Sequence, residues 1–260
     1  MLKKIFFRTQ IFLFLFSFIP NSYAFTYENW QIFINEAGGE DCVQNKVVHD
    51  NAFYLYAFLD KCSLVEYTDF KAWDRSEQQA FLINYYNACS YALFLKNPFS
   101  QNLQEYSVGP DAELFLIFGK KHSLNEIKHK YLRGMFDDER IHFALAPPAY
   151  VFPKLRKEVY LSDYLNLMLE EDVIRFLRDA NYIQINSIRK VVKISPILKW
   201  FGNDFVKRYA GDEFSLSKFS LAEQSIIRFA ASYLPEYREF LLSGDYDLVF
   251  MDADWKLRIK

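Results

Sequence analysis

The sequence predicts an α+β fold in a single domain, rich in helix and with a small, mostly antiparallel sheet. The stretch AFLINYYNACSYALFL, within residues 76–96, is apolar on nearly every side, which indicates a helix buried at the centre of the molecule. Strand-like segments follow the first helices and then mix with further helices, an order typical of α+β folds. Residues 25–260 fit the length of one large domain, and we find no linker or repeat.

The first 24 residues have the pattern of a secretory signal peptide. Lys3, Lys4 and Arg8 precede an apolar run over residues 11–19, and Ser22-Tyr23-Ala24 supplies small residues where a signal peptidase cuts. The run is about half of the roughly 20 residues that a membrane span needs. We therefore expect cleavage after Ala24 and a periplasmic or secreted mature chain without a membrane span.

Composition argues against nucleic acid as a partner. The chain has 31 basic and 33 acidic residues, and loss of the leader with its three basic residues makes it more acidic. Nucleic-acid binding depends on clustered Lys and Arg, which this sequence lacks. The 27 Phe and 18 Tyr are enough to fill a core, although aromatic side chains also line sugar- or peptide-binding surfaces.

The three cysteines are Cys42, Cys62 and Cys89. In an oxidising compartment a Cys42–Cys62 disulfide is plausible, and its loop of about 20 residues would stabilise the fold by roughly 3 kcal/mol. Cys89 lies inside the long apolar helix, where we expect it to pack as a small hydrophobic residue.

Local patterns give the expected elements in order. Helices occupy residues 25–72, and Ser76 with Gln79 forms a capping box that opens the long helix. A strand at residues 114–119 and a second capping box, Ser123 with Glu126, precede a helix that ends at Gly134. Residues 140–146 alternate polar and apolar and are expected to form a half-buried strand. The remaining predictions are a helix at 163–180, a hairpin at 182–194, a short helix after Ser195-Pro196, a helix at 216–233 and a strand at 247–258.

Two pairs of polar side chains are candidate site residues. Asn84 and Asn87 fall on one stripe of the buried helix, where they either clamp neighbouring backbone or belong to a binding site. His129 and Arg133 share a face of the next helix, which suits either an ion pair or an anion-binding site. Trp200 and Trp255 are expected in the core.

A set of short stretches, taken together in their order and spacing, identifies a resemblance to a known family. They are Ile83-Asn84, Tyr86-Asn87-Ala88, Ser123–Ile127 with His129, Leu132 and Arg133, Asp138 with Arg140–Leu145, Pro153 with Leu155, Ser195, Ile197, Lys199-Trp200, Asp204-Phe205 and Asp254-Trp255 with Leu257. Over about residues 50–258 they resemble the bacterial and plant family called domain of unknown function 547 (DUF547). Lys128 stands where the family usually carries an acid. The family typically has a loop with two cysteines and a serine, and those positions fall here on Pro147, Phe152 and Ala149.

The sharpest catalytic hypothesis uses His142 as a base oriented by Asp254. Asn84 or Asn87 would donate hydrogen bonds to a developing oxyanion, as in papain-like acyl transfer. The nucleophile is missing, however, because Cys89 lies in mid-helix and activated cysteines favour helix N-termini or cationic neighbours.

We therefore favour a non-catalytic binding or scaffold module, with a pocket lined by Asn84, Asn87, His129, His142 and Asp254 as the remnant of a family site. The alternative is a papain-like or transglutaminase-like hydrolase or acyltransferase that uses His142 with Asp254. A third possibility is an interaction protein that uses exposed aromatic side chains; the partner, a protein or a small molecule, is unknown.

No metal or cofactor is expected. The sequence has no H-E-x-x-H motif and no calcium-binding loop, and its eight glycines form no dinucleotide or phosphate-binding motif. The aspartates at 245, 247, 252 and 254 are interpreted as a solvated acidic segment.

Overall fold

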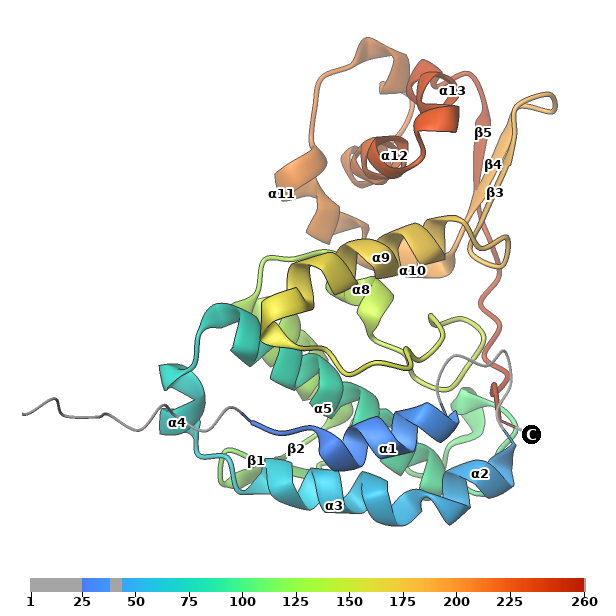
Figure 1. The fold of residues 1–260 in the computed structure, drawn as a ribbon. Coiled ribbons are helices and arrows are strands. Elements are labelled where there is room, and N and C mark those ends of the chain that lie inside the picture. Colours follow the sequence, from blue (N-terminus) through green and yellow to red (C-terminus); the bar gives the residue numbers. More distant parts are fainter. Residues whose placement is uncertain (1–24, 38–43, 260) are drawn as a thin grey trace, which may run out of the picture.

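The computed structural model describes residues 25–37 and 44–259 and shows the helix-rich α+β architecture that the sequence predicts (Figure 1). Its lower part is mostly helical, its upper part combines helices with a three-stranded sheet, and α8, α9 and α10 lie between the two. The elements of the lower part are α1 (Glu28–Ala37), α2 (Asn45–Asp50), α3 (Ala52–Ser63), α4 (Tyr67–Ala72), α5 (Arg75–Leu95), η1 (Leu103–Glu105), β1 (Phe115–Ile117), β2 (Lys120–His122), α6 (Leu124–Glu126), η2 (Ile127–Leu132) and α7 (Arg133–Met135).

The predicted central helix is α5, which is buried from Gln78 to Phe94 without interruption. Its N-cap is Asp74, whose side chain accepts a hydrogen bond from the Glu77 N–H at 2.7 Å. The prediction of a capping box at Ser76 was therefore wrong by two positions, because an aspartate just upstream offers the stronger acceptor.

A second helix of the lower part spans residues 124–135. Ser123 caps it as predicted, with its hydroxyl accepting from the Glu126 N–H at 3.0 Å. The helix runs through α6, η2 and α7, and η2 is a six-residue π-helical segment. Such widened turns are rare and are found often at functional sites.

The predicted strand at 140–146 is wrong. Residues 141–144 form the short helix α8, and residues 141–149 are all buried. The alternating pattern predicts one solvent-exposed face. Arg140 and His142 instead pair with acids inside the protein, so neither face is exposed to solvent. Asp138 starts the helical turn by accepting from the Arg140 N–H at 3.1 Å.

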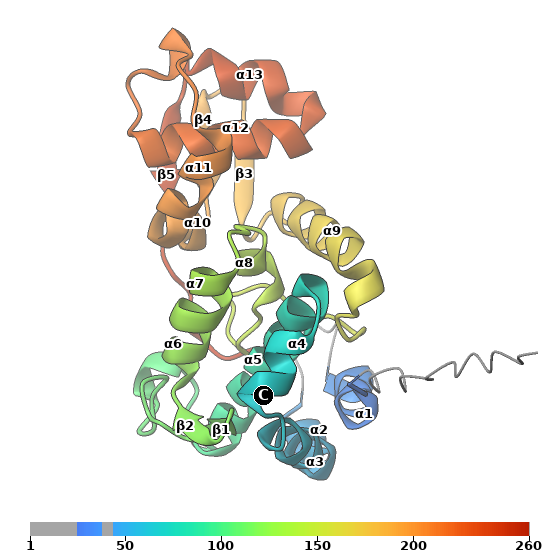
Figure 2. The same ribbon diagram turned by 90° about the vertical axis from the view of Figure 1, so that its left-hand side faces the viewer.

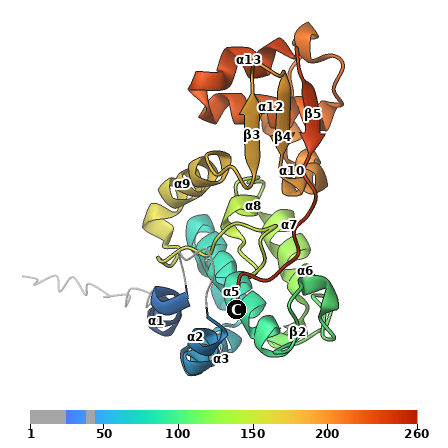
Figure 3. The same cartoon turned by 90° about the vertical axis from the view of Figure 1, so that its right-hand side faces the viewer.

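The predicted hairpin at 182–194 is present and carries a third strand. In the upper sheet, β4 pairs antiparallel with β3 and parallel with β5. Helices α12 and α13 lie on one face of this sheet (Figures 2 and 3). The middle and upper elements are α8 (Ile141–Ala144), η3 (Ser162–Tyr164), α9 (Leu165–Leu177), β3 (Ile183–Asn186), β4 (Val191–Ile194), α10 (Pro196–Phe201), η4 (Gly202–Phe205), α11 (Val206–Tyr209), η5 (Phe214–Leu216), α12 (Leu221–Tyr233), η6 (Pro235–Tyr237), α13 (Arg238–Ser243) and β5 (Asp247–Phe250).

After β5 the chain returns to the lower part (Figure 3). Its predicted strand stops at Phe250, and the segment then makes single bridges, Lys256 with Asn102 and Leu257 with Ala149. The buried side chains of Leu257 and Ile259 belong to the lower hydrophobic core. The last residues therefore tie the upper part back to the lower one.

The core divides into two clusters, one in each part of the molecule. The lower cluster surrounds α5 and the upper one surrounds α12, and Phe152 packs against both. In the part of the chain that the structure describes, no helix is both long and apolar enough to cross a bilayer.

Two predictions depend on residues outside the described ranges. The leader, residues 1–24, is one of them, so export stays a prediction. Cys42 also lies outside the described residues, while Cys62 is a free, buried thiol, and the structure thus gives no support for a Cys42–Cys62 disulfide.

Candidate functional site

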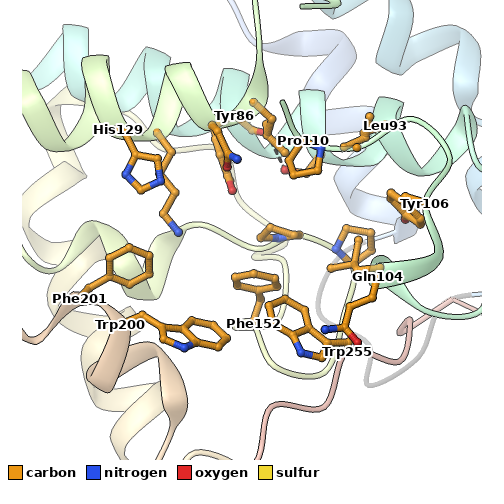
Figure 4. A pocket seen from close by; sticks show the side chains of 18 residues that line it. Tyr86, Leu93, Gln104, Tyr106, Pro110, His129, Phe152, Trp200, Phe201 and Trp255 are labelled. Atoms are coloured by element: carbon orange, nitrogen blue, oxygen red, sulfur yellow. Dashed lines mark hydrogen bonds between the residues drawn. The ribbon is translucent and has the colours of Figure 1, made fainter. Parts of the chain in front are cut away.

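A cavity of about 440 Å³ lies between α5, the Lys128-bearing helix and α10 (Figure 4). It reaches the surface, because Gln104, Pro110, His129 and Trp200 are exposed members of its lining. Most of the lining is aromatic, proline or leucine. The full lining is Tyr86, Ser90, Leu93, Leu103, Gln104, Tyr106, Gly109, Pro110, Leu124, Asn125, Lys128, His129, Pro147, Pro148, Phe152, Trp200, Phe201 and Trp255.

One wall of the cavity is a row of aromatic rings. Trp200 and Trp255 stack with ring centroids 5.3 Å apart, and Phe152 meets Trp255 edge-on at 6.0 Å. Trp200 is 42% exposed, so the prediction that it belongs to the core was wrong. Its large apolar surface forms the wall of a cavity instead, which is common where proteins hold small apolar molecules.

Lys128 is the charged side chain that the cavity encloses most fully. Only 7% of the residue is exposed, and its Nζ lies 4.1 Å from the ring centroid of Phe201 and 5.8 Å from that of Phe152. Among the described residues no carboxylate pairs with it and no group accepts a hydrogen bond from it. Burial, and after it the charge of nearby Arg133, lower the pKa of Lys128 to about 7, against the opposing effect of Asp204.

His129 lies on the same π-helical turn and lines the same cavity (Figure 4). Its Nδ1 is 2.8 Å from Nη1 of Arg133. A guanidinium can only donate, so Nδ1 accepts this bond and the neutral ring carries its proton on Nε2. Partial burial, followed by the charges of Lys128 and Arg133, lowers the pKa of His129 and favours this neutral form.

Arg133 and His142 converge on one carboxylate, that of Asp204 in η4. Arg133 donates from Nε at 2.7 Å and from Nη2 at 2.6 Å, and Nε2 of His142 lies 2.7 Å from Oδ2 of the same group. Burial alone raises the pKa of Asp204, but the hydrogen bonds from His142 and Arg133 outweigh it and hold the pKa well below its ordinary value. The ionised carboxylate thus joins the lower helix to the upper part.

The orientation of His142 differs from the prediction. Its carboxylate partner is Asp204 and not Asp254, which is exposed and accepts from the Lys256 N–H at 3.1 Å. The imidazole stacks on Phe201 at 4.1 Å, and its Nδ1 is buried without a hydrogen-bond partner among the described residues. Burial lowers the pKa of His142 to about 4, which makes it a neutral ring at neutral pH.

Asn84 and Asn87 are backbone clamps and do not line the cavity. Asn84 donates to the Tyr160 carbonyl at 2.8 Å and accepts from the Tyr160 N–H at 3.1 Å and from Trp30 Nε1 at 3.2 Å. Asn87 bridges the Ala144 carbonyl, at 2.9 Å, and the Ala146 N–H, at 2.8 Å. Of the five residues predicted to share one pocket, only His129 lies on the cavity wall.

The loop in which the resemblance places two cysteines and a serine is apolar and belongs to the cavity. Pro147 and Phe152 line the cavity, and Ala149 is fully buried behind them. Buried Arg258 fixes the loop by donating to the carbonyls of Ala149, at 3.3 Å, and Phe152, at 3.2 Å. These hydrogen bonds hold the loop backbone in place, and the three positions Pro147, Ala149 and Phe152 carry no thiol or hydroxyl.

The two thiols among the described residues are sealed in the lower core, as expected for Cys89. Cys62 and Cys89 are both buried, and burial raises the pKa of each thiol well above its ordinary value. In the described ranges there is also no group of three or more His, Cys, Asp or Glu side chains that could hold a metal ion.

Lys128 and Asp204 are the functional candidates that sequence reasoning missed. Both belong to stretches that carry the family resemblance, and Lys128 was recognised only as a replacement for an acid. Two departures from the family pattern could have indicated the site: Lys128 in place of an acid, and the apolar residues Pro147, Ala149 and Phe152 in place of polar ones. The two changes concern the same cavity, which only the fold shows.

Comparison with known proteins agrees with the resemblance. Neither a curated protein nor a solved structure matches the chain. Residues 70–177 match the sequence model of the family described as "Protein of unknown function, DUF547". This span includes α5, the helix with Lys128 and the loop at 147–152, and over these residues the chain is similar to the DUF547 family.

Proposed function

We propose that the protein is an exported, non-catalytic binding module that holds a small amphipathic molecule in the cavity beside Lys128. The apolar body of the ligand lies against the aromatic wall, and an oxygen acceptor of the ligand lies at the Lys128 amine. Export is supported by the leader-like pattern of residues 1–24.

One observation carries the proposal: the Lys128 amine, which among the described residues has no carboxylate or hydrogen-bond acceptor beside it, lies in a cavity of about 440 Å³ with apolar walls. Binding cavities for small molecules measure roughly 300–1,000 Å³ and combine apolar walls with few polar groups. A buried amine without an acceptor costs stability, which an acceptor brought by a ligand would recover. The Tyr106 hydroxyl, on another wall, also has no hydrogen-bond partner among the described residues.

A hydrolase or acyltransferase that uses His142 is the second candidate. The observation in its favour is the contact between His142 and Asp204, since a carboxylate orients the base in such enzymes. Against it, the His142 ring makes no hydrogen bond to a cysteine or serine among the described residues, and Cys89 is sealed in the core. The geometry therefore favours binding over acyl transfer.

Fluorescence titration with anilinonaphthalene sulfonate, an aromatic anion, tests the cavity. We expect saturable binding by the wild type and at least about tenfold weaker binding by Leu103→Trp, whose larger indole would occupy part of the cavity. A tenfold loss corresponds to about 1.4 kcal/mol. The matched control is Leu116→Trp, because Leu116 is exposed and lies outside the cavity lining.

Equal affinities in all three proteins, with each shown to be folded by circular dichroism, would contradict the proposed binding site. Hydrolysis of an aryl ester or thioester that is lost in His142→Gln and kept in Leu116→Trp would support the second candidate instead.

A further inference from the structure

We propose that Lys128 is a carbonyl-reactive amine, and that the cavity takes an aldehyde or ketone with an aromatic or branched apolar body, which it binds as an imine. This inference rests on the proposed function, because the same cavity must first hold the ligand. It goes further by naming the ligand's reacting group and the bond that forms.

The surroundings of the amine favour its neutral, nucleophilic form. Among the described residues the cavity lining contains no Asp or Glu, so no carboxylate of these residues lines the cavity to stabilise an ammonium ion. Arg133, a neighbouring cation on the same helix, opposes a second positive charge, and Asp204 in η4 is already engaged by Arg133 and His142. Lysines made nucleophilic in other proteins are activated by these two means, desolvation and a cationic neighbour.

The π-helical turn places a proton donor next to the amine in sequence and on the same cavity wall. His129 carries its proton on Nε2, because Arg133 donates to its Nδ1. A neutral imidazole N–H can donate a hydrogen bond to the carbonyl oxygen as the oxygen gains charge. His129 would thus act as a positioning and proton-donating group, and Lys128 as the group that forms the bond.

The chemistry balances without a cofactor. The Nζ lone pair attacks the carbonyl carbon, a C–N bond forms, and the π pair of the carbonyl moves to oxygen. A proton passes from the new ammonium group to that oxygen and gives a carbinolamine. Loss of water then leaves the C=N double bond, so nothing is oxidised or reduced.

The reaction should follow the protonation state of the amine. Burial and the charge of Arg133 lower the pKa of Lys128 to about 7, whereas the charge of Asp204 raises it and the neutral ring of His129 adds no charge. Below pH 7 the amine is mostly protonated and unreactive, so its modification rate should rise roughly tenfold per pH unit up to that point and level off above it. The modification rate of an exposed lysine, with a pKa of about 10.4, should still be rising with pH at pH 9.

Reductive trapping tests the proposal directly. The full-length mature protein is mixed with limiting benzaldehyde and sodium cyanoborohydride at pH 7, and the modified lysines are identified by peptide mass spectrometry. We expect Lys128 to be benzylated at least about tenfold faster than the average exposed lysine, with the pH profile given above. The Lys128→Arg variant, which keeps a positive charge but cannot form an imine, should lose the fast phase.

Two further arms separate this inference from the proposed function. Anilinonaphthalene sulfonate should slow the benzylation of Lys128 by occupying the same cavity. If the sulfonate and benzoate bind in the cavity but benzaldehyde labels only exposed lysines, the amine is an ion-pairing group and the imine proposal is wrong, while the binding function stands. If neither class binds and Leu103→Trp changes nothing, the binding function itself fails.

Discussion

Arg133 and Lys128 lie on the same helix of the lower part, yet their charges are treated in opposite ways. The Arg133 guanidinium forms a two-pronged ion pair with Asp204 of the upper part, which also contacts His142. The Lys128 amine points at aromatic rings and, among the described residues, meets no acid. The first arrangement fixes how two parts of the molecule meet, and the second leaves an amine available to a ligand.

The comparison teaches that a partly buried charge is informative only together with its partners. A paired charge is poor evidence for function, because ion pairs of this kind are retained for structure as well. An unpaired one is costly, so a protein that keeps it at a cavity wall gives a testable sign of function.

The largest expected effect comes from removing the carboxylate on the paired side. Asp204→Ala leaves Arg133 and His142 without their acceptor and should lower the free energy of unfolding by about 3 kcal/mol, the lower end of the range for broken ion pairs because the pair is about a quarter exposed. Urea denaturation measures this. The control is Asp212→Ala, at an exposed position, whose free energy of unfolding should stay within about 0.5 kcal/mol of the wild type. Equal losses in both variants would show that the Asp204 ion pair does not stabilise the protein.

Removing the unpaired Lys128 amine should instead raise the free energy of unfolding. Lys128→Met replaces a buried amine by an apolar chain of similar length and should raise the free energy of unfolding at pH 6 by about 2 kcal/mol. With its folded pKa near 7 and an unfolded pKa of about 10.4, Lys128 binds more protons in the unfolded chain between these values, so wild-type stability rises with pH there. The advantage of the variant should therefore shrink from pH 7 to pH 10.

The control for this prediction is Lys193→Met, at an exposed position of β4, which should show neither the gain nor its pH dependence. A loss of stability in Lys128→Met at pH 6 would mean that Lys128 has a stabilising partner after all.

The smallest of the three effects concerns acid. The pKa of His142 falls to about 4 on folding, against about 6.5 in the unfolded chain, so the unfolded chain binds more protons between these values and stability is lost as pH falls through them. By pH 5.5 the loss from His142 should reach about 1.4 kcal/mol.

In His142→Gln the urea midpoint should depend less on pH between pH 6.5 and 5.5 than in the wild type. His49→Gln, at an exposed position, should show the same pH dependence as the wild type. Parallel slopes in all three proteins would place the acid response at other groups.

Sequence patterns sufficed where one local signal decided the structure. The unbroken apolar stretch gave α5, Ser123 gave a helix start, and the residues around 182–194 gave the β3–β4 hairpin. The patterns failed at residues 140–146 because the buried polar side chains there have partners far away in the sequence. Arg140 pairs with Glu170, and His142 pairs with Asp204.

The site was harder to predict for the same reason. Asn84 and Asn87 were placed on the correct stripe of α5, but only the fold shows that this stripe meets the backbone of residues 144–160 and not a cavity. Lys128 was recognised as a departure from a family pattern, and its meaning depends on Phe201, which reaches it from another element.

The returning C-terminal segment sets the order in which the cavity can be completed. Trp255 closes the aromatic wall, Arg258 fixes the loop at 149–152, and Ile259 packs into the lower core. During synthesis the cavity wall therefore cannot be complete until residues 255–259 have emerged. A fragment cut just before Trp255 would keep every described helix but lose one ring of the aromatic wall and the residues that tie it to the lower core.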